Sequence, residues 1–197
     1  MNMKRLIALC VFVFSIPFIT VSAHSAPKAA QLKGVMKFIS DAPLEKIVGT
    51  ANGTGSLTVD TENIESLSGT ITVPVASMKT GNDKRDNHLR GPNWLDEKSH
   101  PTITFSSNGV KVLGPVQTKG AIHAVKLEVQ GNFTLHGVTK PITAPVDLKW
   151  KGQKIKLKTQ FQIALGDFQV KGTEDVVGSK VGKTIDIKVR LRGLIAP

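Results

Sequence analysis

The chain has 197 residues, of which 26 are Lys or Arg and 15 are Asp or Glu, so its formal net charge is +11 at pH 7. Hydrophobic residues make up 40% of it and charged residues 21%, which is typical of one globular domain and excludes a disordered or collagen-like chain. The single cysteine excludes an internal disulfide framework and any metal site built from several thiolates.

The first 23 residues have the features of a secretory signal peptide. Lys4 and Arg5 precede an apolar run over residues 6–21, and a cleavage site ends at Ala23. A membrane anchor is the weaker interpretation, because a span needs ~20 apolar residues and a proline interrupts this run. We expect a periplasmic protein that loses this segment, including Cys10 and two cations.

The rest of the chain is expected to form a flexible segment over residues 24–33 and one domain over residues 34–197. Apolar and polar residues alternate along that domain, as in half-buried antiparallel strands. This alternation predicts strands over residues 57–59, 67–75, 103–105, 110–112, 127–135, 142–150, 155–165 and 185–191.

Turn residues separate these strands. Asn108-Gly109 predicts a hairpin, and Gly152-Gln153 predicts a second one. Eight strands with one apolar face each must close into a barrel or pair as a sandwich. Lysines crowd the polar face and aromatic residues are few, which favours a barrel with apolar residues inside over an outer-membrane barrel.

One polar stretch, residues 77–101, interrupts the strand pattern. Asn82 is a suitable N-cap for a short helix over residues 83–89, and Gly91 would end it. A second short turn would follow, so we expect a helical segment around residues 82–97.

The sequence offers no catalytic or metal-binding constellation, and we do not expect an enzyme. The four histidines after the signal segment that attract attention lack metal-ligand spacing; they are His88, His100, His123 and His136. Paired carboxylates for acid–base chemistry are one interpretation of Asp83, Asp86 and Asp96. We favour ion pairs of Asp86 with Arg85 or Arg90 that fix the helical segment.

Basic residues cluster in the same stretch at Lys79, Lys84, Arg85 and Arg90. Two interpretations remain open for them. They meet an anionic or quinone head group at a barrel mouth, or they form a solvated helix face.

A series of motifs in this stretch and beyond it points to a family. They are MKTGNDKRDNHLRG at residues 78–91, WLD at 94–96, HPTITF at 100–105, GNFTLHGVTKP at 131–141, FQI at 161–163, DFQV at 167–170 and VG at 181–182. Their order and sequence resemble the YceI-like family of secreted, lipocalin-like proteins that bind isoprenoid lipids. The start of the domain departs from the family pattern, since residues 37–45 lack the histidine of its D-x-x-H-S element.

The resemblance implies an all-β fold, an extended eight-stranded antiparallel lipocalin-like barrel. It also implies a non-enzymatic periplasmic protein that holds an isoprenoid or similar long-chain amphiphile, of the quinone or polyprenyl type, for transport or storage. No cofactor is expected besides the bound lipid. A small barrel is either filled by side chains or holds one slim ligand, and the residues alone do not separate these cases. The alternative is therefore a filled-core barrel without cargo that acts as an envelope interaction or stress-related module.

The expected ligand contacts follow from the inward positions of the strands. The barrel interior is expected to include Ile71, Val73, Ile103, Phe105, Leu127, Val129, Phe133, Leu135, Val146, Leu148, Trp150, Phe161, Ile163, Leu165 and Phe168. The family motif places Asn82, Arg85, Asp86, His88 and Arg90 as head-group or motif residues. An interior as long as the strands would hold a tail of roughly 30 to 40 carbons.

The positive charge fits peripheral contact with an anionic membrane, whereas export argues against nucleic acid as a partner. An exposed edge at the first strand would support a homodimer.

Overall fold

The structure is a computed structural model that describes residues 26–197, so the expected signal peptide and Cys10 lie outside the described residues. Its strands are β1 (Lys28–Asp41), β2 (Lys46–Val59), β3 (Ser68–Pro74), β4 (Thr102–Val112), β5 (Gln117–Lys119), β6 (Ile122–Leu135), β7 (Val138–Lys151), β8 (Lys154–Ala164) and β9 (Thr184–Ile195). Its helices are α1 (Asp83–Arg90) and the 3₁₀ turns η1 (Ile64–Ser66), η2 (Val75–Ser77) and η3 (Leu165–Phe168).

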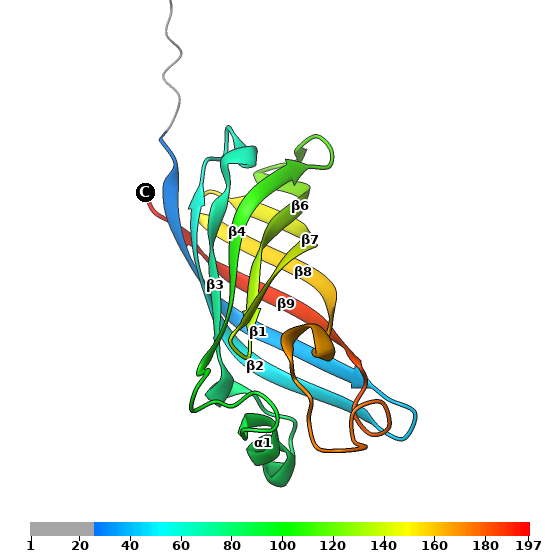
Figure 1. Cartoon of the computed structure of the whole chain (residues 1–197). Helices are drawn as coiled ribbons and strands as arrows, with labels where there is room; N and C mark the ends of the chain where they lie inside the picture. Colours follow the sequence, from blue (N-terminus) through cyan, green and yellow to red (C-terminus); the bar gives the residue numbers. More distant parts are fainter. Residues whose placement is uncertain (1–25) are drawn as a thin grey trace, which may run out of the picture.

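Eight of these strands close into an antiparallel barrel (Figure 1). Their order is β4-β3-β2-β1-β9-β8-β7-β6, and pairing of β4 with β6 closes the ring. The short strand β5 adds to one end of β6. The expected eight-stranded all-β barrel with one short helix is confirmed.

Alternation of exposure along most of the strands gives the barrel an apolar interior and a polar exterior. In β2 every second residue is buried, from Ile47 to Val59. In β8, Ile155 and Leu157 point inward, while the lysines between and beside them, Lys154, Lys156 and Lys158, are exposed. The period of two that predicted the strands is therefore also what separates the inside of the barrel from its surface.

The start of the barrel differs from the sequence expectation. Residues 28–33 are not a flexible segment, because β1 begins at Lys28 and pairs with β2 from its first residue. Strand β1 also pairs with β9 on its other side, so it has no free edge of the kind expected to support a homodimer.

One predicted turn is wrong and another is confirmed. Asn108-Gly109 does not form a hairpin, since β4 runs through it with only a register shift between Ser107 and Gly109. A bulge accommodates the extra residue without reversing the chain. Gly152-Gln153 does reverse the chain, between β7 and β8.

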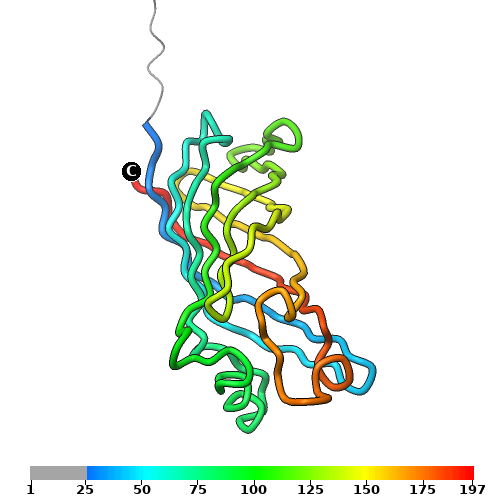
Figure 2. Tube along the Cα trace, in the orientation of Figure 1, coloured from blue at the N-terminus to red at the C-terminus, as the bar shows by residue number. Residues whose placement is uncertain are grey.

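The two ends of the barrel differ. The start of β1 and the C-terminus lie at one end, whereas α1 and the segment between η3 and β9 lie at the other (Figures 1 and 2). The end with the termini is packed with side chains, among them the fully buried Leu127, Leu148 and Ile155. None of the helices within residues 26–197 has the length and apolar character needed to cross a membrane.

Candidate ligand cavity of the barrel

The barrel encloses an apolar cavity of about 340 Å³. This volume lies in the lower part of the range for small-molecule sites, roughly 300–1,000 Å³. Small inward side chains such as Ala51 and Ala144 leave part of this space, because they are buried but reach little of the opposite wall. The interior is thus neither a water-filled channel nor a completely packed core.

Most of the interior residues expected from the sequence line this cavity. They are Ile71, Val73, Ile103, Phe105, Val129, Phe133, Leu135, Val146, Phe161, Ile163 and Leu165. The other four, Leu127, Leu148, Trp150 and Phe168, are buried but do not line it. They belong to the packed core, and ligand contact remains a prediction for the residues that line the cavity.

Packed side chains close the cavity at the end of the barrel that holds the termini. Leu57 and Leu157 line its floor, and the next inward residue of β8, Ile155, lies outside it. Leu157 pairs in register with Leu148, and Ile155 with Trp150. The cavity is therefore shorter than the strands, so the expected tail length of roughly 30 to 40 carbons, which assumed the full strand length, has no support from the cavity.

The opposite end of the cavity has a polar rim. Glu45 comes from the β1–β2 turn, Arg85 and His88 from α1, and Thr173 and Lys180 from the segment between η3 and β9. This segment is tied to the β1–β2 turn, because the Leu44 N–H donates to the Ser179 carbonyl at 3.2 Å. The mouth thus collects charged and hydroxyl groups around an apolar interior.

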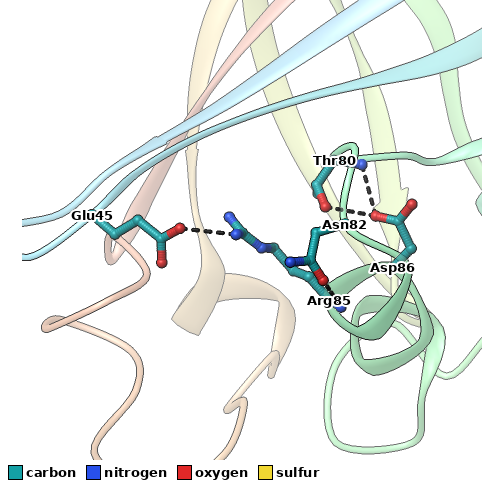
Figure 3. Close-up of polar contacts among 5 residues, drawn as sticks. All are labelled: Glu45, Thr80, Asn82, Arg85 and Asp86. Carbon is teal, nitrogen blue, oxygen red and sulfur yellow. Dashed lines mark hydrogen bonds and ion pairs between the residues drawn. The ribbon is translucent and has the colours of Figure 1, made fainter.

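Helix α1 is positioned at the mouth by its own N-terminal contacts (Figure 3). The Asn82 side chain accepts a hydrogen bond from the Arg85 N–H at 3.0 Å, which confirms Asn82 as the N-cap. Such a cap satisfies a backbone donor that the helix leaves free. The Asp86 carboxylate accepts from the backbone N–H and the hydroxyl of Thr80, at 2.7 and 2.6 Å.

Asp86 is only 3% exposed, and its pKa nevertheless lies below the ordinary value of an aspartate. Burial raises the pKa of Asp86, but the two hydrogen bonds from Thr80 and the charges of Arg90 and Lys79 together lower it below its ordinary value. A buried carboxylate held in this way fixes the start of α1 to the segment between η2 and α1.

The arginines of α1 do not make the expected ion pairs with Asp86. Arg85 instead pairs with Glu45 at 2.9 Å, across the mouth (Figure 3). Arg90 pairs with Glu97 at 3.4 Å and donates to the Met78 carbonyl at 3.3 Å. No spacing signal in the sequence marks these ion pairs, since both acidic partners, Glu45 and Glu97, lie outside the helix.

Of the expected head-group or motif residues, the structure brings only Arg85 and His88 to the cavity. Asn82 and Asp86 hold the helix in place, and Arg90 fixes the chain that follows it. Among residues 26–197, no group of three or more His, Cys, Asp or Glu side chains is arranged to hold a metal ion.

Many lining residues were not foreseen, and some of them belong to the first two strands. Met36, Phe38, Ile47 and Ala51 contribute to the wall. Alternation of Leu32, Met36 and Phe38 with exposed residues of β1 was the available signal. Glu45 and Lys180 lie in turns, where no sequence pattern marked them.

Comparison with known proteins places this barrel among relatives. The family model described as the YceI-like domain matches residues 23–192. Proteins named YceI from Escherichia coli O157:H7 and Shigella flexneri are 31% identical over 123 residues, a match that covers 59% of this chain and only 59% of each relative.

Solved structures share the fold at lower identity. BcnA of Burkholderia cenocepacia is 22% identical with a TM-score of 0.65, over 86% of this chain and 96% of that one. A polyisoprenoid-binding domain from Saccharophagus degradans is 14% identical with a TM-score of 0.64, over 87% of this chain and 99% of that domain.

Proposed function

The chain belongs to the YceI-like family, and from this premise we propose that it is a non-enzymatic protein that binds an isoprenoid or similar long-chain amphiphile inside its barrel. The cargo is of the quinone or polyprenyl type, and the protein stores or transports it in the periplasm. The periplasmic setting is supported by the signal-peptide pattern of residues 1–23. The name of the Saccharophagus degradans domain, which shares the fold, supports the class of ligand.

The observation that carries this proposal is an apolar cavity that is closed at one end and polar at its mouth. Each CH₂ group buried in such a wall contributes about 0.8 kcal/mol before the cost of ordering the chain. An apolar tail therefore needs no polar partner along the interior. Arg85, His88 and Lys180 at the mouth suit the polar head of the same molecule.

A filled-core barrel without cargo is the less favoured alternative. It finds support only in the packed end of the barrel around Leu127 and Leu148. The remaining interior is open and apolar, which a purely structural core has no reason to leave unfilled, because close packing is the norm in protein interiors.

The test uses the exported protein purified without detergent, with its N-terminus fixed by intact mass. Native mass spectrometry and organic extraction then identify retained lipid. Ala144→Phe places a ring in the cavity from β7, whereas Thr143→Phe places the same ring on the outer face of the same strand. We expect the first variant to lose the lipid and the second to keep it, with both melting cooperatively.

An unligated mass for the unaltered protein, repeated after incubation with isoprenoid quinones, would rule out the carrier function. Equal lipid content in the two folded variants would instead show that the cargo lies elsewhere than in this cavity.

A further inference from the structure

A row of basic residues crosses four neighbouring strands on the outside of the barrel. Strands β7, β8, β9 and β1 lie side by side along one wall (Figure 1). Lys149 on β7 pairs in register with Lys156 on β8, Lys156 with Arg192 on β9, and Arg192 with Lys33 on β1. All four are exposed, so four cations stand next to one another in one unbroken row.

Further cations extend this row on both sides. Lys151 pairs with Lys154 toward the end that holds the termini. Lys158 pairs with Arg190, and Lys188 with Lys37, toward the mouth. We call this surface the basic face; its members are Lys33, Lys37, Lys149, Lys151, Lys154, Lys156, Lys158, Lys188, Arg190 and Arg192.

Little negative charge offsets the basic face. Asp147 is the one acidic residue among its cross-strand pairs, opposite Lys158. The ion pairs of Lys46, Arg85 and Arg90 lie elsewhere, and no cation of the basic face has an ion-pair partner within residues 26–197. Apart from Asp147, residues 26–197 therefore leave the charge of this wall uncompensated.

Such an arrangement works against the stability of the sheet. Like charges directly opposite each other on neighbouring strands are destabilising. Solubility alone does not require it, because a surface with both signs interspersed is equally soluble. An anionic partner would offset this repulsion on binding, so the basic face is best explained as a binding surface for an anionic partner.

Exposed apolar side chains within the basic face indicate the kind of partner. Val35, 48% exposed, pairs with Arg190, and Leu194, 59% exposed, pairs with Gln31 of β1 and Lys154 of β8. A mixture of cations and exposed apolar groups suits a lipid surface, where the cations meet anionic head groups and the apolar groups enter the interface.

We propose that the basic face of β7, β8, β9 and β1 is a docking surface for a bilayer that contains anionic phospholipid. This contact is peripheral and uses the outer wall of the barrel, whereas cargo binding uses the interior. The net positive charge of the chain indicated membrane contact without locating it, and this proposal assigns that contact to one wall of the barrel.

The test measures binding of the exported protein to vesicles by co-sedimentation. One set of vesicles contains phosphatidylcholine alone and the other also contains phosphatidylglycerol, and neither contains isoprenoid, so the result does not depend on cargo. The face variant combines Lys33→Gln, Lys156→Gln and Arg192→Gln. The control variant combines Lys98→Gln, Lys111→Gln and Lys119→Gln, which removes the same charge from exposed sites outside the basic face.

We expect the unaltered protein to bind the anionic vesicles in preference to the neutral ones, and added salt to weaken that binding. The face variant should bind them on the order of a hundredfold more weakly, since each cation near the surface contributes about fivefold. The control variant should bind within several-fold of the unaltered protein. The face variant should melt no lower than the unaltered protein, because it loses opposed like charges.

Three results would overturn the proposal. They are equal binding to neutral and anionic vesicles, equal losses in the two variants, and binding to duplex DNA without binding to anionic vesicles. The last result would assign the basic face to soluble polyanions instead of a bilayer.

Discussion

The Thr159 hydroxyl is a polar atom in an apolar wall. It is buried on β8 and lines the cavity one inward step above Leu157. It is also the buried side-chain atom within residues 26–197 that has no hydrogen-bond partner. An unsatisfied buried hydroxyl costs about 1–3 kcal/mol. Without a ligand, the protein is therefore less stable with threonine at this position than it would be with an apolar residue of the same shape.

Thr159→Val should therefore raise the free energy of unfolding by about 1 kcal/mol, and it should leave lipid retention unchanged if the cargo is apolar at this depth. Urea unfolding and native mass spectrometry measure the two effects. Thr143→Val, on the outer face of β7, is the control and should change stability by less than about 0.5 kcal/mol. A variant that is more stable but loses its lipid would mean that the cargo brings a polar atom to Thr159.

At the scale of elements, β7 and β8 were predicted well from their alternation, whereas β2, which has glycine at several inward positions, was not. In β8 the apolar and polar residues alternate along the whole strand, and in β7 they alternate over residues 142–150, so β8 was predicted to within one residue at each end and β7 lacked mainly its first four residues. Strand β2 was predicted only at its last residues. Its inward positions include Gly49 and Gly53, which a sequence pattern takes for turns.

Neighbouring side chains explain those glycines. A Cβ atom at Gly49 would collide with the Phe38 ring, and one at Gly53 with the end of Met36. Large side chains of β1 thus pack over glycines of the neighbouring strand β2. The inward residues of each strand are explained only by those of the other. A local pattern of alternation carries no information about which strands pair. For the same reason it could not predict the contact between Glu45 and Arg85 at the mouth, which joins residues far apart in the sequence.

Helix α1 is joined to the β1–β2 turn by that single ion pair, 2.9 Å long and partly exposed. Exposed pairs contribute only about 0–1 kcal/mol, so Glu45→Gln should leave global stability nearly unchanged. It should, however, loosen the mouth, because Arg85 and Glu45 come from elements on opposite sides of it. Hydrogen exchange of the α1 amides should accelerate by up to about fivefold.

Glu97→Gln is the matched control for this prediction. It removes the partner of Arg90, which lies on the same helix but does not reach the β1–β2 turn. Equal acceleration of α1 exchange in both variants would show that the helix responds to lost charge in general and that the Arg85–Glu45 pair has no special role at the mouth.

At the scale of the whole molecule, the two ends of the barrel are built differently. The two tryptophans mark those ends. Trp94 follows α1 and lines the cavity near its mouth. Trp150 is buried beyond the cavity floor, stacked on His123 with ring centroids 5.3 Å apart. A cargo that enters tail first brings its head group close to Trp94 and keeps it away from Trp150.

This orientation is open to a fluorescence measurement on two variants, Trp94→Phe and Trp150→Phe, each of which retains one tryptophan. An isoprenoid quinone with a short tail is titrated into both, because a quinone ring quenches nearby indole fluorescence, and the matching isoprenoid alcohol serves as the control ligand. We expect strong quenching where only Trp94 remains and weak quenching where only Trp150 remains. The reverse order would mean that the ring enters first and the tail faces the mouth, and the charges of Arg85 and Lys180 would then have no head group to meet.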